Sequence, residues 1–331
     1  MISVVVPSFN RIALLPATLD AILAQSPPAR EVILVDDGST DGTAAMVAAR
    51  YAGRVALCRI ANAGDLAARN AGLARATGRL VAFCDSDDLW RPGYLAAMTA
   101  LWQAEPGLRV AFGNFMLVRD DTWQEMAKFT AAPPGFWDGL RPVPGGGVFD
   151  APIVARLLAF QPFFPSAMVA ERRFLQGLGG WDTSVGRIVG TDFATALLLA
   201  EHPPLGVLHA ALVGIRKHAQ NYSGDVQAMN LGDAAILEMV LAQRPSLAPL
   251  AGAIRASVAR RRVAALEIAF ARGDHAAVRA IHALLPAPAR GGAVAVKAGV
   301  ASLPAALRSV ASAALLAAGS ARARLTRRSP G

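Results

Sequence analysis

Residues 2–41 read ISVVVPSFNRIALLPATLDAILAQSPPAREVILVDDGSTD, and this segment sets the architecture. Two short apolar runs, at residues 2–6 and 31–35, enclose a longer segment in which apolar residues recur every three or four positions. Short runs rich in Val and Ile are typical of buried strands, and the longer spacing is typical of an amphipathic helix. The segment therefore predicts a strand, a helix over residues 14–25 and a second strand.

The same alternation continues as far as residue 84. Residues 55–60 and 80–84 predict two more strands, while residues 43–51 and 63–76 predict helices. Apolar strands that alternate with helices favour a mainly parallel sheet with right-handed crossovers and helices on both faces. The predicted fold class is therefore α/β, with a doubly wound, Rossmann-like sheet.

The rest of the chain changes character twice. Residues 106–160 are rich in Pro and Gly and predict irregular loops around a substrate cleft, whereas residues 166–170 predict a strand and 191–200 a helix. Beyond about residue 227 the pattern becomes almost wholly helical. We expect a catalytic domain at 1–225 and a basic, Ala- and Arg-rich helical region at 226–331.

The two cysteines, Cys58 and Cys84, lie in apolar runs without CxxC or Cys/His spacing, which argues against a zinc site or a disulfide framework. Residues 1–10 lack the basic start and cleavage site of a signal peptide. We expect a cytoplasmic protein, with association at the inner face of the plasma membrane as the alternative location.

Positive charge gathers at the end of the chain. Residues 252–331 carry 13 Lys or Arg and 2 Asp or Glu, a net charge of +11, which leaves −2 for the rest of the +9 chain. A solvated helical face and an anionic membrane surface both explain such a tail, so peripheral membrane contact through these helices is one expectation. Nucleic acid is not an expected partner. The apolar segment 293–318 is interrupted by Lys297, Pro304 and Arg308, which favours an interfacial or bundle helix over a membrane-spanning one.

Polar clusters follow three of the predicted strands. Because the carboxyl ends of parallel strands share one edge of a sheet, and ligands bind there, we expect these clusters to converge on one site. They are Pro7-Ser8-Phe9-Asn10, Asp36-Asp37-Gly38-Ser39 and Asp85-Ser86-Asp87-Asp88.

The carboxylates of these clusters suggest their chemistry. Asp85 and Asp87 could hold Mg²⁺ or Mn²⁺ against phosphate oxygens, where the cation would neutralise charge on a diphosphate leaving group. Asp37 could accept hydrogen bonds from a base imide or a ribose hydroxyl. The structural alternative for Asp85 and Asp87 is a loop that caps the next helix. The structural alternative for the loop around Asp37 is a turn with a helix N-cap.

The motifs at residues 4–10, 35–41, 68–72 and 85–88, taken together and in this order, resemble the family 2 inverting glycosyltransferases, which have the GT-A fold. The resemblance covers about residues 1–225 and implies a metal-dependent enzyme that moves a sugar from a nucleoside-diphosphate sugar, with UDP-sugars favoured, to a hydroxyl. A glycan or lipid-linked acceptor in cell-surface polysaccharide synthesis is implied by the same analogy. The motifs are Val4-Val5-Val6-Pro7-Ser8-Phe9-Asn10, Val35-Asp36-Asp37-Gly38-Ser39-Thr40-Asp41, Ala68-Arg69-Asn70-Ala71-Gly72 and Asp85-Ser86-Asp87-Asp88.

The resemblance also implies roles for single residues. On the nucleotide side, Pro7 and Asp37 would line the nucleoside pocket together with Ser8 and Asn10 of the first motif, and Asp36 would shape the second loop. Arg69 would lie near the nucleotide and Asp85 near the ribose or sugar. Asp87 would be the main metal ligand, with Asp85 and His218 as further ligands.

On the acceptor side, Asp192 matches the position of the family's catalytic carboxylate. The residue before it is normally Glu, and Thr191 stands in its place, which puts acceptor handling in doubt. Trp181 and Asp182 resemble the family's acceptor loop, and Trp181 could present its ring to a sugar, although a core tryptophan after a Gly-Gly turn is equally compatible.

Three other classes compete with this interpretation. A dinucleotide-dependent oxidoreductase is disfavoured, because the first strand leads into Pro7-Ser8-Phe9-Asn10 and not into a G-x-G-x-x-G turn. A nucleotidyltransferase would need a Gly-rich, basic triphosphate loop early in the chain. A non-catalytic nucleotide-sugar-binding or membrane-scaffold protein remains open because of Thr191.

Overall fold

The structure is a computed structural model that describes residues 1–218 and 224–326, with side chains as far as residue 317. By its contacts the chain divides into an α/β unit, Met1–Arg187 with Thr191–Asn221, and a helical unit, Ile188–Gly190 with Tyr222–Gly331. The boundary at residue 225 that the sequence suggests stays a prediction. Each unit is described by itself below.

Four parallel strands form the first half of the sheet in the α/β unit. In the order β3 (Ala56–Arg59), β2 (Glu31–Asp36), β1 (Ile2–Ser8) and β4 (Leu80–Phe83), each pairs with its neighbour in parallel. Strands β1 and β4 are buried along their whole length, which is expected of continuous apolar strands when both faces of the sheet are covered. The strands predicted up to residue 84 are confirmed.

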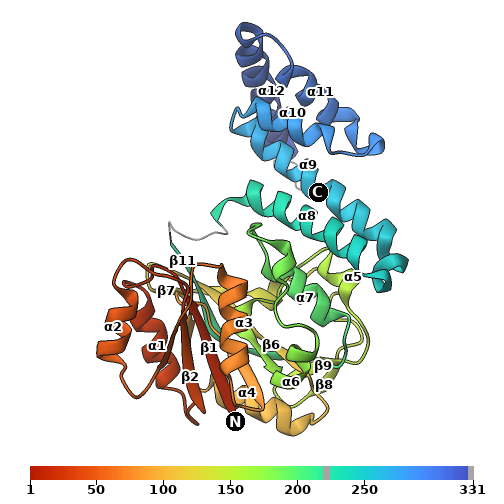
Figure 1. Cartoon of the computed structure of the whole chain (residues 1–331). Helices are drawn as coiled ribbons and strands as arrows, with labels where there is room; N and C mark the ends of the chain where they lie inside the picture. The colour runs from red at the N-terminus through yellow and green to blue at the C-terminus, as the bar shows by residue number, and fades with distance from the viewer. Residues whose placement is uncertain (219–223, 327–331) are drawn as a thin grey trace. The chain divides into compact units, whose positions relative to one another are not determined.

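Helices cover both faces of these strands. The helices are α1 (Leu15–Leu23), α2 (Thr43–Arg50), α3 (Asp65–Arg75) and α4 (Tyr94–Ala104). Val4 and Val6 share a core cluster with residues of α1 and α4. Val5 points to the opposite face, where α3 packs so closely that a Cβ on Gly72 would lie 2.3 Å from a Val5 methyl. Figure 1 shows α1 and α2 on one side of β1 and β2, and α3 on the other.

The second half of the sheet is mixed, which corrects the expectation of a mainly parallel sheet. β10 (Met168–Glu171) runs antiparallel to both β4 and β6 (Val110–Arg119), and β11 (Leu205–Lys217) pairs in parallel with β6. The region expected to be irregular therefore contains strands. The remaining strands are β5 (Leu89–Trp90), β7 (Thr122–Ala127), β8 (Arg141–Val143) and β9 (Gly146–Phe149).

Short helical elements connect these strands. They are η1 (Lys128–Ala131), α5 (Val154–Leu157), η2 (Pro165–Ala167), α6 (Arg172–Gly177), η3 (Thr183–Val185) and α7 (Asp192–Ala200).

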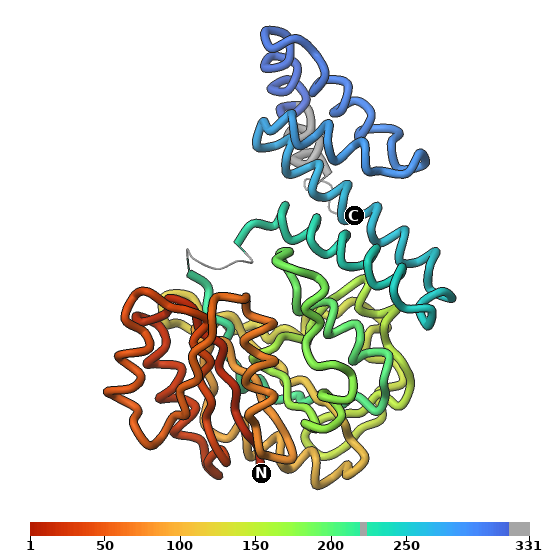
Figure 2. The backbone as a smooth tube through the Cα atoms, in the orientation of Figure 1, coloured from red at the N-terminus to blue at the C-terminus, as the bar shows by residue number. Residues whose placement is uncertain are grey.

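The helical unit confirms the expected C-terminal helical region. α8 (Val226–Gln243) and α9 (Ala251–Ala271) lie side by side (Figure 2), followed by α10 (His275–Ala283), α11 (Gly292–Ala301) and α12 (Ala305–Thr326). η5 (Pro245–Leu250) and η6 (Ala287–Arg290) join them. Pro304 separates α11 from α12, so the apolar segment 293–318 is not one helix. None of the described helices combines the length and the apolarity that crossing a bilayer would require.

Candidate functional site

The predicted nucleotide-side residues converge on one edge of the sheet. β2 and β4 both pair with β1 in parallel, so the loops that follow these three strands leave the sheet at the same edge. Ser8 ends β1, Asp36 ends β2, and Asp85 is the second residue after the end of β4. The sheet therefore brings together the three polar clusters that the sequence singled out.

The two carboxylates at the end of β2 are buried and accept hydrogen bonds. Asp36 is fully buried and accepts hydrogen bonds from Ser39 N at 3.2 Å and Arg59 Nε at 2.9 Å, which shape the loop. Asp37 accepts from Ala63 N at 2.7 Å and Gly64 N at 2.9 Å, one bond to each oxygen. These two hydrogen bonds let Asp37 hold the backbone at residues 63 and 64 in place. Its predicted contact with the base stays a prediction, since each carboxylate oxygen can accept more than one hydrogen bond.

The loop after β1 carries an unsatisfied hydroxyl. Ser8 is 3% exposed, and its Oγ is buried without a hydrogen-bond partner, a condition that native structures rarely leave unexplained. Asn10 adopts a left-handed φ of 51°, and its Oδ1 accepts from Thr40 N at 2.8 Å, so it ties this loop to the loop after β2. An open pocket lies directly beside Asn10. Its lining comprises Asn10–Leu14 and Asp41.

The Asp85–Asp88 loop alternates between buried and accessible side chains. Asp85 and Asp87 are 32% and 13% exposed, whereas Ser86 and Asp88 are buried. This alternation presents the first and third residues of the motif to the surface. Burial raises the pKa of Asp88 well above its usual value, and the charges of Asp87 and Asp85 act in the same direction.

Two residues that the sequence did not single out anchor this loop. Ser166, which is fully buried, accepts from Asp85 N at 2.9 Å and donates to Asp88 Oδ2 at 2.5 Å. Arg216 donates its backbone N–H to Asp88 Oδ1 at 2.9 Å and its guanidinium to the Asp87 carbonyl. Both lie far from the motif in sequence, so no local pattern signals them.

Arg69 balances the negative charge of the same loop. Its guanidinium is 4% exposed, donates to Asp85 Oδ1 at 2.7 Å and to Asp65, and lies 4.7 Å from the ring centre of Trp181. Its Nε is buried without a partner. Burial raises the pKa of Asp85, while Arg69 opposes that shift. A buried guanidinium beside this loop is well placed to meet an anionic ligand.

Asp87 and His218 form the pair that best fits a divalent cation. Asp87 Oδ2 lies 2.9 Å from His218 Nε2 and 3.7 Å from Arg11 Nε. Among residues 1–218 and 224–326, no group of three or more His, Cys, Asp or Glu side chains is arranged to hold a metal ion. Mg²⁺ does not need such a cage, since it is usually held by one or two carboxylates plus substrate phosphates and water. The residues present therefore fit the predicted ion, because Asp87 and His218 lie close enough to contact the same cation.

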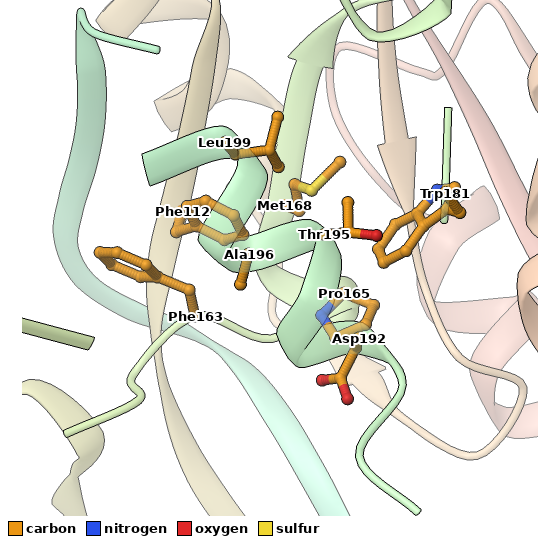
Figure 3. Close-up of a pocket in the computed structure, with 9 residues that line it drawn as sticks. All are labelled: Phe112, Phe163, Pro165, Met168, Trp181, Asp192, Thr195, Ala196 and Leu199. Atoms are coloured by element: carbon orange, nitrogen blue, oxygen red, sulfur yellow. The ribbon is translucent and has the colours of Figure 1, made fainter. Parts of the chain in front are cut away.

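Asp192 begins helix α7 and is half-buried. Thr191 stands at the N-cap position but makes no side-chain capping hydrogen bond, so helix capping does not explain why Thr stands at position 191. Asp192 is near enough to Arg69 to raise the pKa of that guanidinium, although Asp85 and Asp65 raise it more. Figure 3 shows α7 packed on Phe112, Met168 and Trp181, with the carboxylate of Asp192 pointing away from the Trp181 ring.

The acceptor-side residues are held differently from the way the sequence suggested. Trp181 is 2% exposed, with Phe83 edge-to-face at 5.1 Å and Arg69 over its ring. It is therefore a packing residue beneath Arg69, which is the second of the two alternatives that the sequence left open. Asp182 caps η3 by accepting from Ser184 N at 3.0 Å, and its contact with the acceptor stays a prediction.

Comparison with known proteins agrees with this geometry. The model of Glycosyl transferase family 2 matches residues 3–157. The chain is 35% identical over 136 residues to the putative teichuronic acid biosynthesis glycosyltransferase TuaG of Bacillus subtilis, which covers 40% of this chain and 53% of TuaG. It is 38% identical over 121 residues to the succinoglycan biosynthesis protein ExoO of Rhizobium meliloti, which covers 36% of this chain and 34% of ExoO. The chain thus spans from a third to about half of these relatives.

Solved structures show the same fold at low identity. S. aureus TarS 1–349 in complex with UDP-GlcNAc has a TM-score of 0.59 at 17% identity, over 87% of this chain and 82% of that one. The mannosyltransferase PcManGT from Pyrobaculum calidifontis, in complex with GDP-Man and Mn²⁺, has a TM-score of 0.53 at 22% identity, over 96% and 85%. Fold and site therefore define a GT-A-type domain with carboxylates at one sheet edge. Residues 3–157 of the chain carry a family 2 glycosyltransferase domain.

Proposed function

We propose that this chain transfers a sugar, with inversion, from a nucleoside-diphosphate sugar to a hydroxyl of a glycan or lipid-linked acceptor in polysaccharide synthesis. The observation that carries the proposal is the meeting of Asp37, Arg69 and the Asp85–Asp88 loop at the edge where β1, β2 and β4 end. A UDP-sugar is the favoured donor. The names of relatives support this choice, since WfgD of Escherichia coli, 28% identical over 37% of this chain, is named as using UDP-Glc.

On the donor side, the residues would bind and orient the nucleotide. Pro7, the Ser8 hydroxyl, Asn10 and Asp37 would contact the nucleoside, with Asp36 holding the loop in shape. The unpaired Ser8 Oγ and the unpaired Nε of Arg69 are the two buried groups on this side that a polar ligand would satisfy. Arg69 would then stabilise charge on the departing diphosphate, as a fixed guanidinium does without reorganising.

Asp87 and His218 would hold Mg²⁺ or Mn²⁺, with Asp85 as a further ligand or as the contact to the ribose. When bound, the cation would neutralise negative charge on the diphosphate leaving group. Arg11, whose Nε lies 3.7 Å from Asp87, would add positive charge at the same place. The neighbour PcManGT was solved with GDP-Man and Mn²⁺, which supports the choice of ion.

Asp192 would take a proton from the acceptor hydroxyl as its oxygen attacks the anomeric carbon. General base catalysis of this kind contributes typically ~10²- to 10⁴-fold. The half-buried position of Asp192 and its electrostatic influence on Arg69 support the assignment, because both are expected of a carboxylate that lies near the donor-side arginine.

A nucleotide-sugar screen tests the proposal. The purified chain would be mixed with UDP-glucose, UDP-GlcNAc or GDP-mannose, each with and without Mn²⁺, and thermal stability would be followed, since a ligand bound to the native state raises it. Release of nucleoside diphosphate would then be measured with a GlcNAc-diphospholipid as the acceptor probe, the acceptor class in the name of WfgD. Binding without release under any condition would favour a non-catalytic nucleotide-sugar-binding protein. Pyrophosphate release from a nucleoside triphosphate would favour a nucleotidyltransferase.

We also propose peripheral contact between the C-terminal helices and an anionic membrane surface on the cytoplasmic side. Leu307 and Val310 of α12 are 60% and 70% exposed, and Arg308 lies between them. Apolar side chains beside basic ones are typical of interfacial helices. Co-sedimentation with phosphatidylglycerol vesicles should fall in a Leu307→Ser/Val310→Ser variant. Equal binding to neutral phosphatidylcholine vesicles would contradict the electrostatic part of the proposal.

A further inference from the structure

Lys128 carries a half-buried ammonium that packs on an aromatic ring. It begins η1, and its Nζ lies 4.5 Å from the centre of the Phe160 ring, which attracts a cation without cancelling its charge. Among the side chains that the structure describes, no carboxylate forms an ion pair with this ammonium. Partial burial of a cation costs free energy unless a counter-charge compensates for it. An anionic ligand at this position would supply that charge.

Two further cations lie near Lys128. Lys217 ends β11 and is the register partner of Arg119 in the parallel pair of β11 and β6, so these two side chains leave the sheet on the same side. Burial lowers the pKa of Lys128, and the positive charge of Lys217 lowers it further, so the two ammoniums lie within electrostatic reach of each other. We call Lys128, Lys217 and Arg119 the basic cluster. Like charges held together repel, and a local conflict of this kind is expected at a functional site.

Aromatic contacts connect Lys128 to the pocket that Asp192 lines. Phe129, the next residue, donates its backbone N–H to Asn114 Oδ1 of β6 at 3.0 Å, which fixes η1 on the sheet. The ring centres of Phe129 and Phe163 lie 6.5 Å apart, and Phe163 lines the same small pocket as Asp192 (Figure 3). β6 and β11 also belong to the second half of the sheet, beyond the strands β1, β2 and β4 whose ends carry the donor side. Lys128 therefore lies on the Asp192 side of the site.

We infer that Lys128 and Lys217, with Arg119 beside them, bind an anionic group of the acceptor, so that the acceptor is a charged glycan and not a neutral one. The inference rests on the proposed function and names the substrate class of that site. The donor diphosphate has its own counter-charges, namely Arg69 and the cation proposed at Asp87. A phosphate that links a sugar to a lipid and the carboxylate of a uronic acid both offer the oxygens that lysine ammoniums bind.

The test removes the charge of Lys128 and compares a charged acceptor probe with a neutral one. Lys217 is left unchanged because it adjoins His218. Lys128→Met keeps the apolar stem, Lys128→Arg keeps the charge, and Arg75→Met is the matched control, because Arg75 is an exposed cation in the last turn of α3. Nucleoside diphosphate release would be followed with the GlcNAc-diphospholipid and with the uncharged octyl glycoside of GlcNAc. Lys128→Met should raise the KM for the diphospholipid about 10-fold, as expected for the loss of one hydrogen bond to a charged group.

Three quantities should keep their wild-type values in Lys128→Met, namely kcat, the KM for the octyl glycoside and the Kd for UDP with Mn²⁺. Lys128→Arg should recover most of the affinity for the diphospholipid, and Arg75→Met should change none of these quantities. An unchanged KM for the diphospholipid in Lys128→Met would overturn the inference, as would an equal rise for both acceptors. Weaker UDP binding would overturn it too, because the basic cluster would then serve the donor.

Anion binding without turnover separates this inference from the proposed function. Methyl phosphate and acetate would be titrated calorimetrically into protein loaded with UDP and Mg²⁺, which occupy the donor side. At least one of the two anions should bind the wild type saturably and bind Lys128→Met about 10-fold more weakly. Tighter binding of methyl phosphate supports the inference with a phosphate-bearing acceptor, and tighter binding of acetate supports it with a uronic acid.

The same titration decides the inference if the proposed function fails. If no acceptor gives transfer, the proposed function is wrong, and the titration still shows whether the basic cluster holds an anion. No saturable binding of either anion to the wild type would overturn the inference whatever the activity. Equal binding by the wild type and Lys128→Met would overturn it as well.

Discussion

The donor side and the base side of the site are built in different ways. The donor side lies at the ends of three neighbouring strands, and its carboxylates follow those strands directly. The base side is a loop and a helix start, residues 179–192, that no strand carries. Strand ends are fixed by the sheet itself, whereas the base side depends on contacts with residues remote in sequence.

This difference explains why the two sides place different demands on the rest of the chain. On the donor side, hydrogen bonds to neighbouring backbone hold Asp36 and Asp37. On the base side, Trp181 is tied by two hydrogen bonds of 2.8 Å to Asn70, which is 111 residues away in sequence. A substitution on the base side should therefore separate turnover from nucleotide binding more cleanly than one on the donor side.

The largest effect is expected from Asp192→Asn, which tests the base side directly. The amide cannot accept the proton, so transfer should fall by ~10²- to 10⁴-fold while the Kd for UDP with Mn²⁺ stays the same. Steady-state kinetics and calorimetric titration with UDP measure the two quantities. Transfer at the wild-type rate would show that another group removes the proton.

Asp87→Ala is the donor-side counterpart, with an expected loss of ~10²- to 10³-fold in Mn²⁺-dependent turnover. Here binding and turnover should fall together, because the same carboxylate would hold the cation against the nucleotide. Asp20→Ala is a matched control, since Asp20 is an exposed carboxylate that pairs with Arg50 on the outer helices. The comparison between the two sides breaks down if Asp87→Ala lowers turnover without weakening UDP binding in the presence of Mn²⁺.

The sequence was sufficient for the donor half of the fold because each decision there is local. The apolar run at Ile2–Ser8, the helix that follows and the acidic cluster after β2 each show their own pattern within about ten residues. Once the strands are parallel, their ends must meet at one edge, so the convergence of the clusters follows without any side-chain detail.

The remainder could not be predicted because its contacts are long-range. Ser166 and Arg216 anchor Asp88 from 78 and 128 residues away, and neither belongs to a motif. The strands between residues 110 and 149 were hidden by Pro and Gly in their connecting turns. The sequence left open whether Trp181 faces a sugar or packs in the core, and its contacts with Phe83 and Arg69 decide its position.

Ser166→Ala tests whether the donor side also depends on a remote residue. The substitution leaves Asp88 Oδ2 and Asp85 N without their partner in a buried site, which should lower the free energy of unfolding by about 1–3 kcal/mol. Urea denaturation measures this loss. Ser302→Ala is the control, because Ser302 is exposed and donates to a carbonyl of the helix that it caps, Ala298 O. Equal losses in the two variants would show that the donor loop holds its shape without Ser166.

The smallest effect concerns the ion pair between Asp233 of α8 and Arg261 of α9. Burial raises the pKa of Asp233 to about 6, against the opposing charge of Arg261, whereas an unfolded Asp titrates near ~3.9. Between these values the native state binds more protons than the unfolded state, so the contribution of Asp233 to the free energy of unfolding is greatest at low pH and falls as pH rises through 6. Relative to Asp233→Asn, the wild type should lose about 1 kcal/mol between pH 4.5 and 6.5 in urea denaturation. A constant difference across that range would mean that Arg261 keeps Asp233 ionised throughout.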